Sequence, residues 1–356
     1  MIVVGNPANR RVAMFQAALA AEGQPPAQVI AWRELIEPGA PARLLGDARG
    51  LVRIDSSGED ESVERGLLAR GGAPAVPRYE LGRIDHPRLL HAGFVAVLGE
   101  IEAATRHVRH VQPPAAIRLL FDKAECSRQW RALAIPMPEV IDNVRSPDEL
   151  REHMRALGWP TVFVKLTSGS SASCIAMFTH TATGEHALTT IEDTGRARFN
   201  TRKLQRLTTR RQLDRTLGFI IDEGAHVERA IAKAQHDGRC FDLRVVAIDG
   251  VAAFVVMRTS PHEITNLHLG GLRGDVDALR AKISGAAWDA AMASALRVQR
   301  ASGAFHVGVD LMFEPNLRDH RVIEGNAFGD LLPNLTRDGT DVYGWQIRRL
   351  VGTVRA

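Results

Sequence analysis

Oxygen-bearing side chains collect near the carboxyl end of the sequence, on two segments that read as strands. Asp310 lies in the apolar run HVGVDLMF, and Glu324 and Asn326 lie two residues apart in RVIEGN. Because side chains alternate along a strand, Glu324 and Asn326 share a face, and the intervening turn can fold that face beside Asp310. Two carboxylates and an amide oxygen suit Mg²⁺, which also keeps waters and phosphate oxygens as ligands. A surface hairpin with incidental polar residues remains the alternative.

Two lysines and a loop of small residues are typical of phosphate binding. Lys165 is near the end of the apolar run TVFVKL, just before the small-residue segment SGSSAS, and Lys123 precedes both. A lysine ammonium is a compact charge suited to phosphate, and a small flexible loop can bring backbone N–H groups against phosphate oxygens. Taken singly, each lysine could equally be an exposed end of a helix or strand.

A third charged group lies on the segments that flank the turn IDG, which ends at Gly250. Asp242 and Arg244 share a strand face, as an acid and a forked donor that could form a simple cross-strand ion pair. A two-residue turn places Arg258 on the face opposite Arg244, whereas a three-residue turn with a bulge at Gly250 brings both arginines to one face. An active-site role for Arg258, whose planar fork can bind a carboxylate bidentately, needs the second geometry.

The elements that must position these side chains predict a mixed α/β (α+β) fold. The chain begins with a strand, a turn and a helix, typical of an open α/β domain, and the turn lacks the G-x-G-x-x-G spacing of a dinucleotide site. The later strands read as hairpins, and the consecutive prolines of QPPAA at 112–116 suggest an extended linker and a domain boundary. We expect helices at 11–21, 87–109, 117–133, 147–157 and 275–299, and strands at 2–4, 161–166, 174–179, 226–232, 240–248, 251–258, 306–313 and 321–326.

Two further charged features can be interpreted either as solvated helix surface or as functional sites. His107 and His110 have a helical spacing that could bind a metal, but the arginines around them favour a solvated helix face. Between Arg196 and Arg215, eight basic residues accompany the single acid Asp214. This stretch is either a solvated helical face or a basic lid or groove wall near phosphates.

Composition sets broad limits on the class of protein. The chain has 356 residues, 45% apolar, which suggests two or three globular domains. Its formal net charge of +4 makes nucleic-acid binding unlikely. Three scattered cysteines indicate a reducing compartment, and the sequence shows neither a secretory leader nor a membrane-spanning run. We therefore expect a cytoplasmic protein with no membrane partner, and leave open whether it forms a homodimer.

Taken in order, these motifs resemble the ATP-grasp superfamily, in particular its glutathione synthetase and glutamate-ligase-like branch. The correspondence covers about two thirds of the chain. It begins with DK at 122–123 and continues through VFVKLTSGSSAS, VERAI and FDLRVVAIDG to MRTSPHEITNLHLGG, VGVDLM and VIEGN. The resemblance implies an ATP-grasp fold, with an N-terminal pre-ATP-grasp-like domain at 1–112, a central ATP-grasp subdomain with a lid at 113–225, and a C-terminal subdomain with the metal and acceptor site at 226–356.

Each quoted motif brings an expected role from the family. Lys123 and Lys165 resemble phosphate-binding lysines, and SGSSAS resembles the mobile loop that closes over the phosphates. VERAI resembles the adenine hinge, and Arg244 resembles the arginine that stabilises the transferred phosphate, with Asn266, Gly270 and Gly271 in the acceptor site. The expected sets are thus Arg244, Arg258 and Asn266 for catalysis; Lys123, Lys165, Ser168, Gly169, Ser170, Ser171, Glu228, Arg229, Ala230 and Ile231 for ATP; and Asp310, Glu324 and Asn326 for one or two Mg²⁺ ions.

The resemblance implies an ATP-dependent carboxylate–amine ligase that forms an amide or peptide bond through an acyl phosphate. Its substrates would be a carboxylate and an amine, each a small molecule or a peptide. An ATP-grasp kinase and a non-catalytic nucleotide-binding subunit remain the alternatives. The sequence departs from the family pattern after the hinge, where Lys233 and Gln235 stand in place of a ribose-binding acid, and in the single glycine of its loop.

Overall fold

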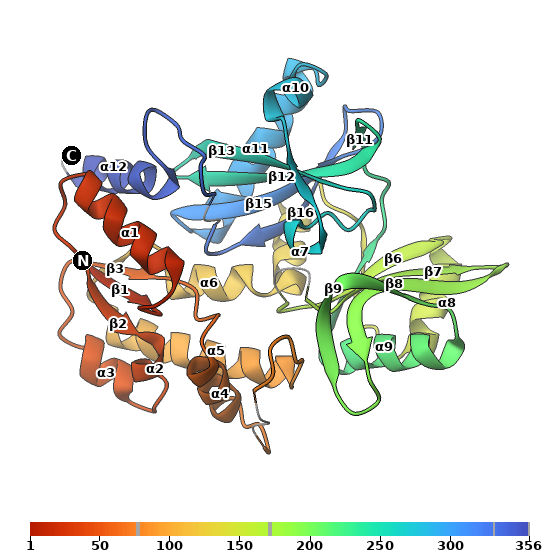
Figure 1. Ribbon diagram of the computed structural model, residues 1–356, viewed down its shortest axis with the longest axis horizontal. Coiled ribbons are helices and arrows are strands. Elements are labelled where there is room, and N and C mark those ends of the chain that lie inside the picture. Colours follow the sequence, from red (N-terminus) through yellow and green to blue (C-terminus); the bar gives the residue numbers. More distant parts are fainter. Residues whose placement is uncertain (76–78, 170–172, 330–331, 355–356) are drawn as a thin grey trace.

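The computed structural model describes residues 1–75, 79–169, 173–329 and 332–354. Within these ranges the strands form three sheets, which divide the molecule into an N-terminal, a central and a C-terminal lobe (Figure 1). Each sheet is covered by helices, so mixed α/β architecture is confirmed.

The N-terminal lobe is an open parallel sheet of strand order β2-β1-β3-β4. Its strands have the short apolar cores expected where helices cover both faces, as in the fully buried IVVG of β1. The elements are β1 (Ile2–Gly5), α1 (Arg10–Ala21), β2 (Gln28–Ala31), α2 (Trp32–Leu35), α3 (Ala40–Leu45), β3 (Leu51–Ile54), α4 (Glu61–Arg70), α5 (Pro87–Ala104) and β4 (Arg109–His110).

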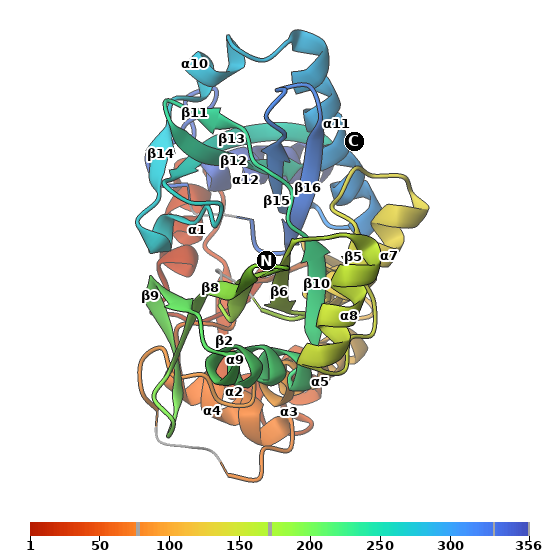
Figure 2. The same cartoon turned by 90° about the vertical axis from the view of Figure 1, so that its right-hand side faces the viewer.

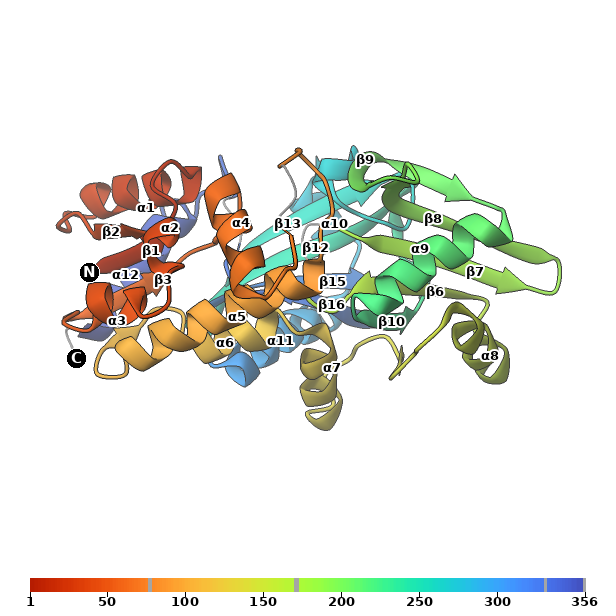
Figure 3. The ribbon, with the colours of Figure 1, turned by 90° about the horizontal axis from the view of Figure 1, so that it is seen from below.

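The central lobe is an antiparallel sheet of order β5-β10-β6-β7-β8-β9, with α8 and α9 packed on one side (Figure 3). The expected hairpin around SGSSAS is present, because β6 and β7 pair from Thr161 with Thr179 to Lys165 with Ile175. Its elements are β5 (Val140–Ile141), α8 (Pro147–Leu157), β6 (Thr161–Leu166), β7 (Ile175–Thr181), β8 (Gly184–Asp193), β9 (Arg198–Leu207), α9 (Arg210–Asp222) and β10 (Ala225–Arg229). The preceding helices, α6 (Pro114–Leu120) and α7 (Lys123–Ala132), pack in a core that residues of the N-terminal and C-terminal sheets share.

The C-terminal lobe is an antiparallel sheet of order β14-β13-β12-β15-β16, to which the short β11 adds beside β12. Helix α11 packs against this sheet, and Figure 2 shows the sheet above the central one. The elements are β11 (Gln235–His236), β12 (Arg239–Ile248), β13 (Val251–Ser260), the 3₁₀ turn η1 (Leu267–Leu269), β14 (Leu272–Gly274), α10 (Val276–Arg280), α11 (Gly285–Ser302), β15 (His306–Phe313), β16 (His320–Asn326) and α12 (Val342–Val354).

The last helix returns to the first lobe. Helix α12 lies beside α1, where Tyr343 meets Phe15 edge-on at 6.0 Å and Arg348 Nε contacts Glu22 Oε2 at 2.8 Å (Figure 1). Apolar residues of β12 and β13 join the same core. The domain boundaries expected at 112 and 225 stay predictions, and β10 on the latter boundary pairs within the central sheet.

Polar caps divide two of the expected long helices. The helix expected at 117–133 is two, because Asp122 caps α7 by accepting from Glu125 N at 2.9 Å. Similarly, Ser284 caps α11 and separates it from α10 within the helix expected at 275–299. The prolines of QPPAA do not form an extended linker, because Pro114 occupies the first turn of α6, where a missing N–H costs nothing.

The basic stretch and the histidine pair also differ from their helical interpretations. The stretch at 196–215 forms the edge strand β9 and the start of α9. Helix α5 ends at Ala104, so His107 lies beyond it and bonds Ala48 O, while His110 lies in β4 and bonds Thr105. The two histidines therefore do not share a helix face. In the described part of the chain, no helix has the length and apolarity to cross a membrane.

Candidate functional site

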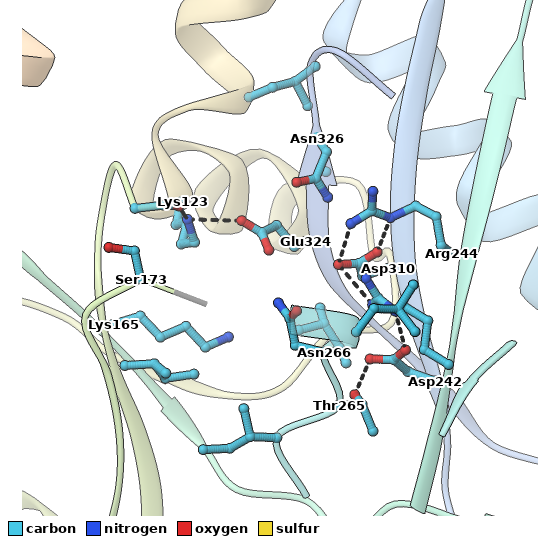
Figure 4. Close-up of a pocket in the computed structure, with 18 of the residues that line it drawn as sticks. Lys123, Lys165, Ser173, Asp242, Arg244, Thr265, Asn266, Asp310, Glu324 and Asn326 are labelled. Atoms are coloured by element: carbon cyan, nitrogen blue, oxygen red, sulfur yellow. Dashed lines mark hydrogen bonds and ion pairs between the residues drawn. The ribbon is translucent and has the colours of Figure 1, made fainter. Parts of the chain in front are cut away.

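A cavity of about 480 Å³ lies where the three lobes meet. Its walls come from the β6–β7 hairpin, the segment after β10, strands β12, β13, β15 and β16, and two loops of the N-terminal lobe. In Figure 4, Lys123 and Lys165 lie on one side, Arg244 and Asp310 lie on the other, and Lys165 and Asn266 point into the space between. Most of the residues singled out from the sequence thus come together.

Strand pairing brings the expected metal-binding residues onto one face. Asp310 on β15 pairs directly with Glu324 on β16, and Gly308 pairs with Asn326. The next pair is Leu311 with Val322, so Ile323 is an extra residue on β16. This bulge changes the direction of the neighbouring Glu324 side chain. Asn326 donates through Nδ2 to Gly308 O at 3.0 Å, which fixes the side chain and turns its amide oxygen away from that bond.

Asp310 is a buried carboxylate between two arginines. Arg244 Nη2 lies 3.2 Å and Arg258 Nη2 lies 3.1 Å from Asp310 Oδ2. Burial alone would raise the pKa of Asp310, but the two guanidinium charges outweigh it and lower the pKa to about 2. Asp242 completes the network by accepting from Arg258 Nε at 2.7 Å. Asp310 is therefore ionised at any physiological pH.

The turn after β12 and a bulge on β13 together decide where Arg258 points. Ile248 pairs with Val251 across a two-residue turn whose central residues both have positive φ, 46° and 77°, as in a type I′ turn. On that register alone Arg258 would face away from Arg244. However, the pairing shifts by one residue at Ala253, which restores Arg258 opposite Asp242 and on the face of Arg244. The same-face geometry is present, although its bulge is not at Gly250.

The two lysines are each held by a carboxylate. Lys123 Nζ lies 3.0 Å from Glu324 Oε1 and also donates to Gly169 O. Lys165 Nζ lies 2.6 Å from Glu228 Oε2. Burial would raise the pKa of Glu228, but the Lys165 ammonium and the hydrogen bond from His226 lower it to about 2. Both ammonium groups are thus fixed in place by an ion pair at the cavity wall.

Most residues of the expected hinge line the cavity. Glu228, Arg229 and Ile231 line it, whereas Ala230 does not. The N–H of Arg229 donates to Glu139 O at 2.8 Å and that of Ala230 to Thr161 O at 3.1 Å, so these two donors are used within the fold. The side chain of Arg229 pairs with Glu139 at 2.9 Å.

Two loops complete the expected site. Gly169 and Ser173 of the SGSSAS loop line the cavity, Ser168 does not, and the expected Ser170 and Ser171 lie outside the described residues. Asn266 lines the cavity from the loop after β13. A Cβ at Gly271 would lie 2.6 Å from Asn266 O, so this loop needs glycine for its close backbone approach.

Apolar side chains and one buried lysine complete the cavity walls, and sequence reasoning did not assign them. Phe163 and Met312 line it two residues from Lys165 and Asp310 respectively, so strand alternation could have identified both. Lys233 is buried, donates to Thr265 Oγ1 at 2.6 Å and lies 3.6 Å from Asp242 Oδ2. Burial lowers the pKa of Lys233, and Asp242 opposes this shift.

The donor chemistry of the β15–β16 face fits a hard cation that shares its shell with phosphate. The two carboxylates are adjacent in register, and Glu324 Oε1 faces Lys123 while the other oxygen remains for a ligand. Among the described residues, no group of three His, Cys, Asp or Glu side chains is placed to hold a metal ion. A cation here would therefore need the Asn326 oxygen and non-protein oxygens, as Mg²⁺ accepts.

Comparison with known proteins identifies solved structures of the same architecture. No protein-family model and no curated protein sequence matches the chain. The ATP-grasp ligase PsnB, complexed with a phosphomimetic variant of its minimal precursor, Mg and ADP, superimposes with a TM-score of 0.55 at 15% identity, covering 99% of this chain and 98% of that one. The D-cycloserine synthetase DcsG gives 0.56 at 16% identity, covering 98% and 99%.

A third structure, the D-alanine–D-alanine ligase of Bacillus anthracis complexed with ATP, gives a TM-score of 0.53 at 14% identity, covering 99% of this chain and 97% of that one. The likeness in all three spans nearly the whole length of both chains. At these identities it establishes the architecture, and the chain therefore has the ATP-grasp fold that its motifs predict.

Proposed function

We propose that this chain is an ATP-dependent ligase that joins a carboxylate to an amine. The observation that carries the proposal is the cavity itself, in which Lys123 and Lys165 face Arg244 across a space bordered by Asp310 and Glu324. Such a charge arrangement suits a polyphosphate with bound cation more than a neutral ligand. Solved ligases of the same fold hold ADP with Mg, or ATP.

The apolar walls set the orientation of the nucleotide. Phe163 pairs with Glu228 of the hinge and lines the cavity together with Ile231 and Met312, a set that fits the flat apolar surface of adenine. Lys165 lies two residues beyond Phe163 on β6, on the same face, so the phosphates would extend from the hinge toward the lysines. Asp310, Glu324 and Asn326 would hold Mg²⁺, which supplies neutralisation of the phosphate charge during transfer.

The proposed reaction has two steps. A carboxylate oxygen attacks the γ-phosphorus, the bond to the bridging oxygen breaks, and ADP leaves an acyl phosphate behind. The amine then attacks the carbonyl carbon, inorganic phosphate leaves, and the amine nitrogen loses a proton. No enzyme nucleophile takes part, so the chain acts by holding the reactants and stabilising the charge that develops.

Individual residues then have separate tasks. Lys123 and Lys165 bind the phosphates, and Arg244 stabilises the phosphoryl group in transfer. Arg258 directs Nε at Asp242 and Nη2 at Asp310, so any grip on a substrate carboxylate would share those contacts, and its main task is to position Asp310. Asn266 contributes to the acceptor site.

Hydroxylamine trapping tests the proposal. With ATP, Mg²⁺, hydroxylamine and a panel of carboxylic acids, a ligase yields a hydroxamate and an equal amount of ADP, because an acyl phosphate is electrophilic at carbon. Arg244→Ala should lower the hydroxamate yield at least tenfold. Arg239→Ala is the matched control, since Arg239 lies on the same strand but bonds Thr259 outside the cavity.

The alternatives have different outcomes in the same assay. A kinase forms ADP with a stable phosphorylated product and no hydroxamate, whereas a non-catalytic subunit binds ATP and releases no ADP. Either result contradicts the ligase proposal.

A further inference from the structure

The N-terminal lobe contributes a crevice that the proposed nucleotide site does not use. In the strand order β2-β1-β3-β4, the chain leaves β1 toward β2 on one side and later returns to β3 on the other. The segments that follow β1 and β3 therefore diverge, which opens a crevice at the carboxyl ends of these strands. Asn9 and Arg11 follow β1, Ser56 and Glu59 follow β3, and all four line the cavity.

Hydrogen bonds hold the two segments together. The buried Asn6 donates through Nδ2 to Ser57 O at 3.1 Å and to Gly58 O at 2.9 Å. Asn9 donates through Nδ2 to Glu59 Oε2 at 2.9 Å. Glu59 itself has φ 66°, a conformation that is uncommon for a residue other than glycine. The crevice is thus pre-formed, with an acid held at its exposed rim.

Arg11 places a positive charge beside the proposed point of phosphoryl transfer. Its Nη1 donates to Phe328 O at 3.0 Å, while Arg244 Nη1 donates to Gly329 O at 3.4 Å. The two guanidinium groups therefore bind adjacent carbonyl groups of one loop. A carboxylate paired with Arg11 would lie next to the phosphate that Arg244 is proposed to stabilise.

An apolar wall adjoins these charges. Phe121 and Phe328 line the cavity and meet edge-on at 5.7 Å. Phe121 lies two residues before Lys123, and Phe328 lies two residues after Asn326. The wall therefore lies beside the proposed phosphate site and not beside the hinge. A substrate side chain, and not adenine, would contact it there.

We infer that this crevice binds the acid substrate as a free amino acid with an apolar side chain. Arg11 pairs with its carboxylate, Glu59 pairs with its ammonium, and Phe121 and Phe328 contact its side chain. Each charge of the zwitterion then meets one opposite charge. Glu59 has no opposite charge to pair with when the acid lacks a free ammonium, as in an acylated amino acid or in the side chain of an internal peptide residue. The inference rests on the proposed ligase activity and specifies the substrate of the same cavity.

Titration calorimetry on the full chain with Mg²⁺ and a non-hydrolysable ATP analogue tests this assignment. The probes are D- and L-leucine and D- and L-phenylalanine, each beside its N-acetyl derivative, with glutamate and lysine for side-chain selectivity. We expect at least one apolar amino acid to bind ten or more times more tightly than its N-acetyl form, glutamate and lysine.

Two variants assign that selectivity to the crevice. Glu59→Gln should reduce the preference over the N-acetyl form to threefold or less, with the affinity for the ATP analogue unchanged. Arg11→Gln should weaken binding of both forms of the amino acid by a larger factor than it weakens binding of the ATP analogue. Glu61→Gln is the matched control, because its side chain is about half exposed and contacts Arg65 on the surface of α4. The melting temperature of each variant shows whether it folds.

The outcomes separate the crevice from the reaction. Equal binding of free and acetylated amino acids, no binding of any amino acid in the panel, or a preference that Glu59→Gln leaves intact overturns the inference. Hydroxamate formation from acylated or peptide carboxylates alone also overturns it, while the ligase proposal stands. Tight, Glu59-dependent amino acid binding without ADP release supports the crevice and contradicts the ligase.

Discussion

The pair of Lys165 and Glu228 should affect folding stability and ATP binding separately. Both side chains are nearly buried, at 12% and 6% exposure, and they belong to the neighbouring strands β6 and β10. Glu228 also accepts from His226 Nε2 at 3.0 Å. Lys165→Met removes the ammonium and leaves a buried carboxylate with the imidazole as its remaining partner.

The size of the stability effect follows from the pKa of Glu228. Burial raises that pKa, but Lys165 and His226 lower it from 4.5 to about 2. At about 1.4 kcal/mol for each pH unit, this net difference corresponds to about 3 kcal/mol of folding free energy, to which burial, Lys165 and His226 all contribute. Because the folded-state pKa is the lower one, this stabilisation is present above pH 4.5 and is lost as the pH falls toward 2.

Urea unfolding and nucleotide titration measure the two effects. At pH 7, Lys165→Met should lower the free energy of unfolding by about 3 kcal/mol or more, because removing one partner of a buried ion pair leaves an uncompensated buried charge. Adding Glu228→Gln should restore at least half of the loss, because no unpaired charge then remains. ATP affinity should fall at least tenfold in both variants, since both lack the ammonium. Lys203→Met, on the exposed part of β9, is the control and should change neither quantity.

Two results would refute this reasoning. If Lys165→Met unfolds at the same urea concentration as the native chain, the pair does not stabilise the fold. If the double variant recovers ATP affinity, then Lys165 does not bind phosphate and Glu228 alone accounts for the defect. A further check is that the stability difference between the native chain and Glu228→Gln should narrow between pH 4.5 and 2.

Three other substitutions test the rest of the site. Glu324→Gln should keep the melting temperature within a few degrees but nearly abolish Mg²⁺-dependent ADP release, and an unchanged Mg²⁺ titration would contradict the metal assignment. Gly271→Ala should lower turnover but not ATP affinity, because a Cβ there would lie 2.6 Å from Asn266 O. Gly99→Ala is its control, because a Cβ at Gly99 meets open space. Equal turnover of the two variants would show that the loop tolerates the contact. Asp242→Asn should lower the unfolding free energy by about 3 kcal/mol or more, because the guanidinium and ammonium that contact it lose their buried counter-charge; a neutral effect in urea unfolding would contradict this.

Local patterns in the sequence were sufficient for the strands that carry the site and for the faces of their side chains, but not for others such as β3, β8 and β9. Alternation placed Glu324 and Asn326 on one face of β16, and the small residues after Lys165 predicted the β6–β7 hairpin. These predictions succeeded because a strand has a period of two wherever it lies in a sheet. The order of the motifs then predicted the ATP-grasp fold.

Helix ends were less well predicted, because one hydrogen bond can decide them. A continuous helical pattern ran through Asp122, yet its carboxylate accepts from the N–H of Glu125 and starts a new helix. The basic stretch has charges compatible with either a helix or an edge strand, and pairing with β8 selected a strand for its first half.

Sequence alone determined which chemical groups were available, among them two lysines, carboxylates, amides and arginines in an order that resembles the ATP-grasp pattern. Only the tertiary structure decided how they face one another. The bulge at Ala253 turned Arg258 toward Asp310, and the N-terminal crevice brought Arg11 beside Phe328, 317 residues away. Such contacts depend on strand register and on the packing of distant lobes, which no local periodicity encodes.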